Sequence, residues 1–407
     1  MQAAERKRRR KERRRRRRRN RETQPEELSP SPLAHEIISH ENKPLHPHIH
    51  TNTERDMIPT AAFAASTPSS LPSSLPSSLA PALDQAATLL HSASRLLIFT
   101  GAGMSADSGI STFRKDKNSF WGGIGGGMAL AYFGTPVGWS LTPTLAWTKY
   151  VDMFLAPIVM ARPHEGHYAL GELVEEKEEE GMEGWREGGR EGEVKVITMN
   201  VDNLHERAGG FGWEEEGREG GREGRSRRRV VHLHGSVGRN LCVKHGLLSR
   251  LPSFPRGEKG GGDNGEGGGG GEKQVQSATD DEMKQLLDEY KQYKCPSCGR
   301  APRPDITLFG ESLPVGELSL AARAIDRLNP ATNDVLLVIG TTGGVYPAAS
   351  LPEMALKKGV RVIEVNMHPS SISGAADVFL QGRAKELLPA LLERVREKKK
   401  NERKEER

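Results

Sequence analysis

The sequence predicts an α/β protein, a Rossmann-like doubly wound parallel sheet with a smaller zinc-binding module inserted. Short apolar runs recur along the chain, and most are continuous rather than alternating, which is typical of parallel strands covered on both faces. Helical patterns lie between these runs. Two cysteines stand as Cys295-Pro-Ser-Cys298, which has the spacing of a metal half-site.

Only part of the chain has the composition of a folded protein. Hydrophobic residues make up 35% of its 407 residues and the mean hydropathy is −0.60, both low for a chain that is folded throughout. Residues 1–22 hold 14 Lys and Arg against 3 Asp and Glu, so this segment carries +11 and the remainder −6, for a total of +5. The folded part is therefore not basic, and composition gives no indication of a nucleic-acid-binding domain.

Residue usage favours an intracellular protein. Three cysteines do not make a disulfide framework, and a Cys-x₂-Cys pair is typical of a metal site in a reducing compartment. No apolar run reaches transmembrane length, and the N-terminus lacks the apolar stretch of a secretory signal. We therefore expect no membrane partner.

Residues 1–83 are expected to be a disordered tail, basic at first and then rich in Ser and Pro. The Arg/Lys run at 6–19 favours a nuclear address, or a weak polyanion contact. A tail without a role, or a wrongly predicted gene start, is the alternative. A mitochondrial or plastid address fits less well, because the run is too dense in charge and too poor in Ser.

The predicted folded domain covers residues 84–395 and is followed by a charged tail at 396–407. Its first helix is expected at 84–94 and its first strand at 95–100. Further strands are expected at 194–198, 230–233, 334–339 and 360–365, and helices at 316–328 and 349–358. Three Gly-rich or Gly/Glu/Arg-rich segments break the pattern and are expected to be disordered insertions in surface loops, at 175–193, 212–229 and 252–276.

The first strand runs into a segment of small residues, 101–114, which reads Gly-Ala-Gly-Met-Ser-Ala-Asp-Ser-Gly-Ile-Ser-Thr-Phe-Arg. Small residues after a strand let backbone N–H groups approach a pyrophosphate, and the N-terminus of a following helix favours its negative charge. The segment therefore indicates a nucleotide-binding βα unit. An ordinary strand-to-loop turn is the alternative.

This segment resembles the signature of the sirtuin family, and four further motifs follow in the family's order. Residues 198–205 resemble its second NAD motif and residues 231–236 its catalytic-histidine motif. Residues 295–311 resemble the zinc half-site with the acyl-peptide strand, and 340–349 with 365–366 the closing NAD segments. The similarity spans about residues 85–392. It implies an NAD-dependent enzyme that removes acyl groups from protein lysines and releases nicotinamide and O-acyl-ADP-ribose.

The resemblance also implies which residues bind the cofactor. They are Gly101, Ala102, Gly103, Ser105, Asp107, Gly109, Ile110, Phe113, Arg114, Met199, Asn200, Asp202, Gly340, Thr341, Thr342, Asn366 and Ala384. The implied catalytic residues are His234, Asn200 and Asp202, with His234 as the general base toward a ribose hydroxyl, a role that suits imidazole near neutral pH. Asp202 has an alternative role as a helix N-cap. His232 is interpreted as a packed or solvated strand residue.

A structural zinc ion needs four ligands, and the resemblance places the first pair shortly after the catalytic histidine. The chain has Cys242-Val-Lys-His245 there, whereas the family normally has a second Cys at the position of His245. Cys₃His is an accepted zinc set, so we expect Zn²⁺ on Cys242, His245, Cys295 and Cys298, in a module of about residues 238–303. A degenerate site without metal is the alternative.

Two regions are implied to bind the acyl-lysine substrate. An extended stretch would pair with the substrate backbone, and it holds Leu308, Phe309, Gly310 and Glu311. Tyr150 and Met153 stand where the succinyl- and malonyl-removing class, the class most similar to this chain, has Tyr and Arg. Because Met153 lacks the guanidinium that would pair with an acyl carboxylate, we expect a preference for neutral acyl groups.

Two other functions would use the same scaffold. A mono-ADP-ribosyltransferase needs the NAD site but no acyl-lysine tunnel. A non-catalytic module that binds NAD or acyl-lysine is the second alternative, and Met199, where the family usually has Gln, leaves both open. A hydride-transferring dehydrogenase is disfavoured, because the chain has neither Gly-x-Gly-x-x-Gly nor a clear acidic residue after its second strand.

Overall fold

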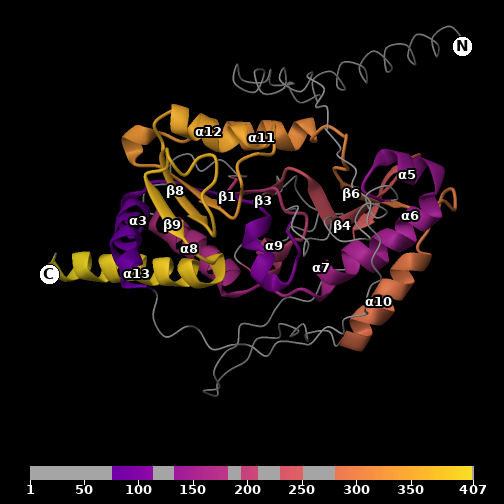
Figure 1. Ribbon diagram of the computed structural model, residues 1–407, viewed down its shortest axis with the longest axis horizontal. Helices are drawn as coiled ribbons and strands as arrows, with labels where there is room; N and C mark the ends of the chain where they lie inside the picture. Colours follow the sequence, from indigo (N-terminus) through magenta and orange to yellow (C-terminus); the bar gives the residue numbers. More distant parts are fainter. Residues whose placement is uncertain (1–75, 113–132, 182–193, 210–229, 251–279, 406–407) are drawn as a thin grey trace, which may run out of the picture.

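The computed structural model describes residues 76–112, 133–181, 194–209, 230–250 and 280–405 (Figure 1). The basic run at 6–19 and the expected insertions at 212–229 and 252–276 lie outside the described residues. Two of the expected cofactor-binding residues, Phe113 and Arg114, also lie outside them. What the sequence predicts for these positions stays a prediction.

A six-stranded parallel sheet forms the centre of the protein. Its order is β3-β2-β1-β7-β8-β9, and every pairing is parallel. The strands are β1 (Leu96–Thr100), β2 (Val196–Thr198), β3 (Val230–His232), β7 (Val335–Ile339), β8 (Arg361–Asn366) and β9 (Val378–Gln381). Each of the five apolar runs in the sequence forms a strand, and β9 is an addition to them.

Helices cover both faces of this sheet (Figure 1). On one face lie α3 (Ala80–Ser92), α8 (Glu165–Gly181) and α13 (Ala384–Glu405), and on the other α11 (Val315–Asp326) and α12 (Ser350–Lys357). A hydrophobic core lies between the sheet and the helices on each face. Along β1, Ile98 packs into the core under α3, α8 and α13, whereas Leu97 and Phe99 pack into the core under α11 and α12. A strand with a core on each side is apolar at every position, which explains the continuous runs. The doubly wound α/β prediction is confirmed.

Two helices run further than the sequence indicated. α8 continues to Gly181, although an insertion was expected from residue 175, and α13 continues to Glu405 through the charged segment. Arg396 on α13 pairs with Glu172 and Glu176 on α8, at N–O distances of 2.9 and 2.5 Å. These ion pairs hold α13 against α8 where the charged segment of α13 begins. No described helix, α13 included, has the length and apolar character needed to cross a membrane.

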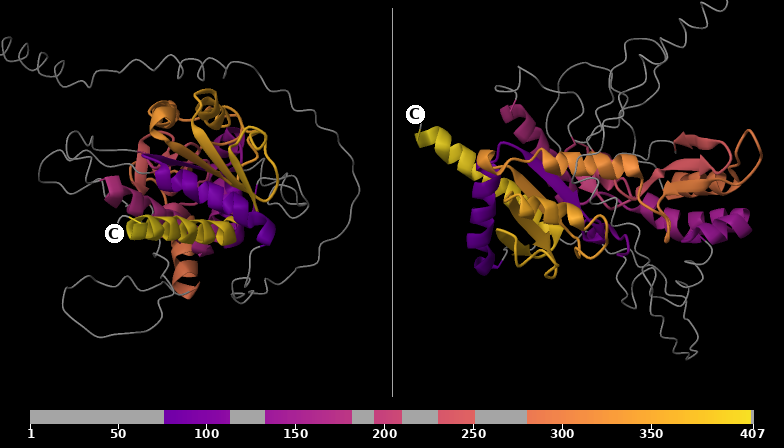
Figure 2. Two further views of the ribbon diagram at one scale, coloured as in Figure 1. Left: turned by 90° about the vertical axis from the view of Figure 1, so that its left-hand side faces the viewer. Right: turned by 90° about the horizontal axis from the view of Figure 1, so that it is seen from above.

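A smaller antiparallel sheet lies beside the large one, with the order β5-β4-β6. Its strands are β4 (Gly235–Cys242), β5 (Gly246–Arg250) and β6 (Arg303–Ile306). The helices nearest to it are α5 (Pro136–Leu141), α6 (Pro143–Tyr150), a π-helical turn (Val151–Leu155), α7 (Ala156–Met160) and α10 (Asp280–Gln292). They share a third core, rich in aromatic side chains. This small module and α13 lie at opposite ends of the long axis (Figure 2, right).

The strand order reverses between β1 and β7. β1 pairs with β2 on one side and with β7 on the other, and loops at the carboxyl ends diverge at such a point and leave a crevice. The segment that begins at Gly101 follows β1, Asn200 and Asp202 follow β2, His234 follows β3, and Gly340 follows β7. The topology therefore brings motifs that are far apart in the sequence to one edge of the sheet.

Candidate active site

Two glycine loops meet at the reversal point with no side chain between them. The Gly103 nitrogen donates to the Gly340 carbonyl at 2.8 Å, and a Cβ on Gly103 would lie 2.7 Å from the Gly340 Cα. Gly340 has a φ of +64°, and a Cβ there would lie 2.3 Å from the Met104 nitrogen. Only glycine fits at either position, because any side chain would force the backbones apart. The rim of the crevice thus stays narrow and free of side chains, as close approach to a phosphate requires.

Asn200 and Asp202 are fixed at the carboxyl end of β2. The Asn200 nitrogen donates to Thr198 Oγ1 at 3.0 Å, and Asn200 Nδ2 donates to Ser105 Oγ at 3.0 Å. The Asp202 carboxylate accepts from the Leu204 nitrogen at 2.9 Å, at the start of α9 (Leu204–Arg207). Burial raises the pKa of Asp202, although hydrogen bonds from Leu204 and Ser105 oppose this. The N-cap of α9 is Asn203, so Asp202 is not the N-cap residue; it precedes the N-cap, binds the first backbone N–H of the helix and also faces the pocket.

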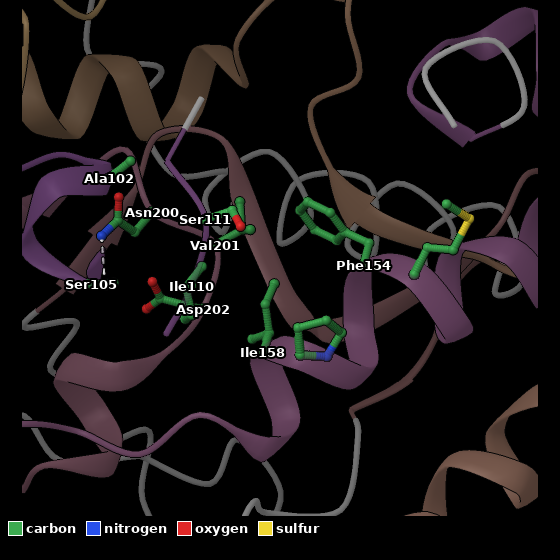
Figure 3. Close-up of a pocket in the computed structure, with 11 residues that line it drawn as sticks. Ala102, Ser105, Ile110, Ser111, Phe154, Ile158, Asn200, Val201 and Asp202 are labelled. Carbon is green, nitrogen blue, oxygen red and sulfur yellow. Dashed lines mark hydrogen bonds between the residues drawn. The ribbon is translucent and has the colours of Figure 1, made fainter. Parts of the chain in front are cut away.

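A pocket of about 580 Å³, counting its open mouth, lies between this polar edge and the small module (Figure 3). It is lined by Ala102, Ser105, Ile110, Ser111, Met153, Phe154, Pro157, Ile158, Asn200, Val201 and Asp202. Asn200 and Asp202 occupy one side, and Phe154 and Ile158 face them from the other (Figure 3). The site can therefore hold a ligand with a polar end and an apolar end. Apart from Met153, the apolar wall was not predicted from the sequence, although the apolar run at 154–160 was a signal for it.

His234 lies just beyond β3, partly buried. Its Nδ1 donates to the Met199 carbonyl at 3.2 Å, so the proton is on Nδ1 and Nε2 keeps a lone pair. Burial lowers the pKa of His234 below its usual value, and the bond to the carbonyl offsets part of this effect. The His234 carbonyl accepts from the Thr307 nitrogen at 2.8 Å, which ties the residue to the small module. A neutral imidazole with one available lone pair has the form of a general base.

His232 is buried and makes two polar contacts. Its Nε2 lies 2.5 Å from Glu206 Oε1, and its Nδ1 lies 3.1 Å from the Asn200 carbonyl oxygen. The structure therefore agrees with the interpretation of His232 as a packed residue of the strand. The pairing with Glu206, a residue of α9, was not expected from the sequence.

The closing segments lie at the ends of β7 and β8. Asn366 Nδ2 donates to the Thr341 carbonyl at 2.5 Å, and Thr341 Oγ1 accepts from the Gly343 nitrogen at 3.2 Å. Asp107, in the loop after β1, pairs with Arg383 at 2.6 Å, next to Ala384. Of the expected cofactor residues that the structure describes, most thus lie in the loops after β1, β2 and β7, whereas Asn366 ends β8 and Ala384 begins α13.

Three sulfur atoms and one imidazole nitrogen converge in the small module. The donor atoms of Cys242, His245, Cys295 and Cys298 all lie within 4.8 Å of one another. Sγ of Cys242 lies 3.6 Å from Nδ1 of His245 and 3.6 Å from Sγ of Cys298, and that Nδ1 lies 3.4 Å from Sγ of Cys295. A tetrahedral zinc ion with bonds of about 2.3 Å to sulfur and 2.0 Å to nitrogen would place its ligands about 3.5–3.8 Å apart. The cluster therefore fits zinc, with His245 ligating through Nδ1.

The expected substrate residues divide between the pocket and the interior. Met153 lines the pocket, but Tyr150 is buried in the aromatic core, stacked on Trp147 with ring centroids 5.7 Å apart. Burial raises the pKa of Tyr150 well above its usual value, and its hydroxyl has no hydrogen-bond partner among the described residues. Tyr150 is not among the residues that line the pocket.

The expected substrate strand is shorter than its sequence suggests. β6 ends at Ile306, and Gly310, with a φ of +89°, lies in a turn. Leu308 is buried, and Glu311 pairs with Arg303 at 2.7 Å and accepts from the Leu308 nitrogen at 2.9 Å. Phe309 is exposed. Leu308 and Glu311 therefore stabilise the turn, and the Phe309 nitrogen donates to the Gly134 carbonyl at 2.8 Å.

The Sir2 family profile matches residues 101–347. The chain is 38% identical to NAD-dependent protein deacylase 2 of Pyrobaculum aerophilum, over 76% of this chain and 94% of that protein. It is 35% identical to the NAD-dependent protein deacylase of Thermococcus kodakarensis, over 77% of this chain and 96% of that protein. A solved complex of a Sir2 homologue with NAD matches with a TM-score of 0.51 at 27% identity, covering 77% of this chain and 94% of the other.

These similarities run the length of the described domain. The family match begins at Gly101, where the small-residue loop leaves β1, and includes the polar edge, His234 and all four residues of the metal cluster. The relatives are covered almost completely, so the whole domain is shared rather than one motif. The chain belongs to the Sir2 family, the sirtuins.

Proposed function

We propose that this sirtuin is an NAD-dependent protein-lysine deacylase that converts NAD, an acyl-lysine and water into nicotinamide, lysine and O-acyl-ADP-ribose. One observation carries the proposal. His234, with an available lone pair on Nε2, lies at the same edge of the sheet as Asn200 and Asp202, and those two side chains line a pocket with an apolar wall. The names of the relatives, NAD-dependent protein deacylases, agree with this reaction.

The polar edge would hold the nicotinamide and ribose end of NAD. When bound there, NAD supplies the nicotinamide–ribose bond that breaks, with positive charge developing at the anomeric carbon. The buried Asp202 carboxylate would stabilise that charge and Asn200 would orient the leaving amide, because both are preorganised by hydrogen bonds. The glycine loops would take the pyrophosphate through backbone N–H groups.

His234 would act as the general base toward a ribose hydroxyl. The Met199 carbonyl fixes the proton on Nδ1, so Nε2 can only accept. This interaction uses the backbone of residue 199 and not its side chain, so Met in place of Gln leaves the base intact. The metal cluster contains no group directed at the pocket and would serve a structural role, holding β4 and the chain around Cys295 together.

We also propose that the acyl group is neutral. Met153, Phe154, Pro157 and Ile158 form the wall opposite the polar edge, and none of them carries a charge. A succinyl or malonyl carboxylate buried against this wall would lack a partner. Acetyl and longer apolar acyl chains would instead gain from burial.

The test uses the full chain, purified with its metal, and peptides carrying acetyl-, butyryl-, myristoyl- or succinyl-lysine. Mass spectrometry follows nicotinamide and acyl-ADP-ribose. We expect acyl-ADP-ribose from the neutral peptides and its loss in His234→Ala. His91→Ala is the matched control, because His91 lies at the surface between α3 and α13 and pairs with Glu402.

Each other product pattern identifies a different function. ADP-ribose left on protein without acyl-ADP-ribose would replace the deacylase by a mono-ADP-ribosyltransferase. NAD or acyl-peptide binding without any product would indicate a non-catalytic module. Faster turnover of the succinyl peptide than of the neutral ones would refute the neutral acyl preference.

The compartment stays a prediction. The Arg/Lys run at 6–19 supports a nuclear address or a weak polyanion contact by its composition alone. Localisation of the full chain with and without residues 1–22 would test it.

A further inference from the structure

His232 faces two acceptors at once. Nε2 lies 2.5 Å from the Glu206 carboxylate and Nδ1 lies 3.1 Å from the Asn200 carbonyl, which can only accept. A neutral imidazole has one N–H and could satisfy only one of them if both are acceptors. With Glu206 ionised, the geometry requires a proton on each nitrogen, and hence an imidazolium.

The pair is enclosed by protein. The His232 side chain is 11% exposed and that of Glu206 is 9% exposed. Burial works to lower the pKa of His232, but the Glu206 charge and the hydrogen bonds to Glu206 and Asn200 raise it above its usual value. Burial likewise works to raise the pKa of Glu206, and the charge of His232 lowers it overall. Loss of either partner would leave the other charge buried and unpaired, which is costly.

The contacts of this pair lead to the nicotinamide end of the site. Asn200 is held at its nitrogen by Thr198, at its amide by Ser105 and at its carbonyl by His232. Asn203 Nδ2 lies 3.5 Å from Glu206 Oε1, and Asn203 Oδ1 accepts from Ser236 Oγ at 2.7 Å. His232 and Glu206 therefore connect the segment after β2 with β4 of the small module.

We propose that His232 and Glu206 are a positioning pair, in which a doubly protonated His232 holds the Asn200 carbonyl and so keeps the segment 200–202 in its NAD-binding geometry. The proposal rests on the proposed function for what this segment binds. Two histidines of one strand end then hold consecutive carbonyls, Met199 by His234 and Asn200 by His232. Catalysis requires His234 neutral and His232 charged.

This opposition predicts how NAD binding depends on pH. Other ionisable groups that act on His232 are His205 on α9, Asp202 after β2 and Arg239 on β4, and Arg239 is paired with Asp305 at 2.8 Å. Because the folded pKa of His232 is raised, its contribution is present below the usual histidine value of 6.5 and is lost as the pH rises through the raised value. Activity should therefore have an alkaline limb from His232 and an acid limb from His234.

Glu206→Gln is the informative variant, because it keeps an acceptor near Nε2 but removes the charge. We expect the alkaline limb of kcat/KM for NAD to move down by about one pH unit or more, with the acid limb unchanged. At pH 8, KM for NAD should rise about tenfold, by more than kcat falls. Glu402→Gln, which removes the other His–Glu pair at His91, should leave the profile unchanged. An unmoved alkaline limb in Glu206→Gln would overturn the proposal.

Two measurements on the unaltered chain cover the case in which the variant does not fold. With ¹³C,¹⁵N-labelled protein, NMR should show both His232 nitrogens protonated at neutral pH, with the ring assigned by through-bond correlation to its own backbone. A neutral ring there would overturn the proposal whether or not the protein is active. Calorimetry should show the NAD dissociation constant rising at alkaline pH without any turnover. A charged His232 with pH-dependent NAD binding, but no acyl-ADP-ribose, would support the pair and reject the deacylase.

Discussion

Histidine shows most directly how surroundings decide a residue's chemistry in this enzyme. His234 is partly buried beside a carbonyl and is neutral, whereas His232, two residues earlier, is buried beside a carboxylate and is charged in our proposal. His245 is exposed and lies among sulfur atoms. The motifs in the sequence predicted His234 as the base and His245 as a metal ligand. It gave no sign of the His232–Glu206 pair, because the partner lies on another element.

The acid limb of activity follows from the surroundings of His234. Burial lowers its pKa, so the neutral base should persist below pH 6.5, the usual value for histidine, and activity should be lost only as the pH falls through the lowered value. The pH profile of kcat/KM for NAD tests this. An acid limb at or above the usual histidine value would mean that another group titrates.

Met153 should set acyl selectivity at the pocket wall. Met153→Arg introduces a guanidinium that can pair with an acyl carboxylate, so the succinyl-to-butyryl ratio of kcat/KM should rise about tenfold or more. Leu141→Arg on α5 is the control, because Leu141 is 76% exposed, does not line the pocket and should leave the ratio unchanged. If both variants behave alike, the acyl group does not contact this wall.

At the scale of elements, patterns of burial were predictable and contacts between elements were not. The continuous apolar runs predicted five strands of the large sheet, because strands covered on both faces cannot alternate. The end of α8 was misplaced, since Glu-rich sequence suggested an insertion while Arg396 on a distant helix pairs with those glutamates. Tyr150 matched a family position, but the surrounding Trp147 and Trp139 draw its ring into the core.

The junction between His234 and the small module depends on Gly235. This residue has a φ of +78°, and a Cβ there would lie 2.1 Å from the Asp305 carbonyl oxygen on β6. Gly235→Ala should therefore destabilise the protein by about 3 kcal/mol or more, by combining backbone strain with overlap. Gly246→Ala has a similar φ of +76° but no atom within 4 Å, so it should cost only about 1 kcal/mol. Urea unfolding measures both free energies of unfolding. If the two variants lose the same amount, the structure around Gly235 shifts and relieves the overlap with Asp305.

At the scale of the whole molecule, the two parts that form the site are stabilised in different ways. The large sheet is held by two apolar cores, and the small module by an aromatic core together with the metal cluster. The sequence predicted both parts, whereas the expected module of about residues 238–303 did not include the helices between Pro136 and Met160 that share its core. It did not predict how they face each other, because the apolar wall and β4 contribute to one pocket only in three dimensions.

Removing the metal should therefore affect one part of the molecule. With a chelator, hydrogen exchange should accelerate in β4 and β6 and stay slow in β1, β7 and β8, whose cores contain no ligand. His245→Cys should retain the metal and His245→Ala should lose it, and a Co²⁺-loaded protein should report the change from three sulfur ligands to four by its absorption spectrum. Uniform unfolding on chelation would show that the two parts are a single cooperative unit.

The four-residue metal cluster also implies that the chain tolerates an inserted polypeptide between its two ligand pairs. Cys242 and His245 lie before β5, and Cys295 and Cys298 lie after α10, so a bound ion would clamp the chain on both sides of the stretch between residues 250 and 280. With its ends fixed by coordination bonds, the length of that stretch adds only a logarithmic entropy cost. A fluorescent protein or an affinity tag could be inserted there without changing either terminus. A fluorescent insert would then report loss of the metal, because its mobility would increase once the two cysteine-containing segments separate.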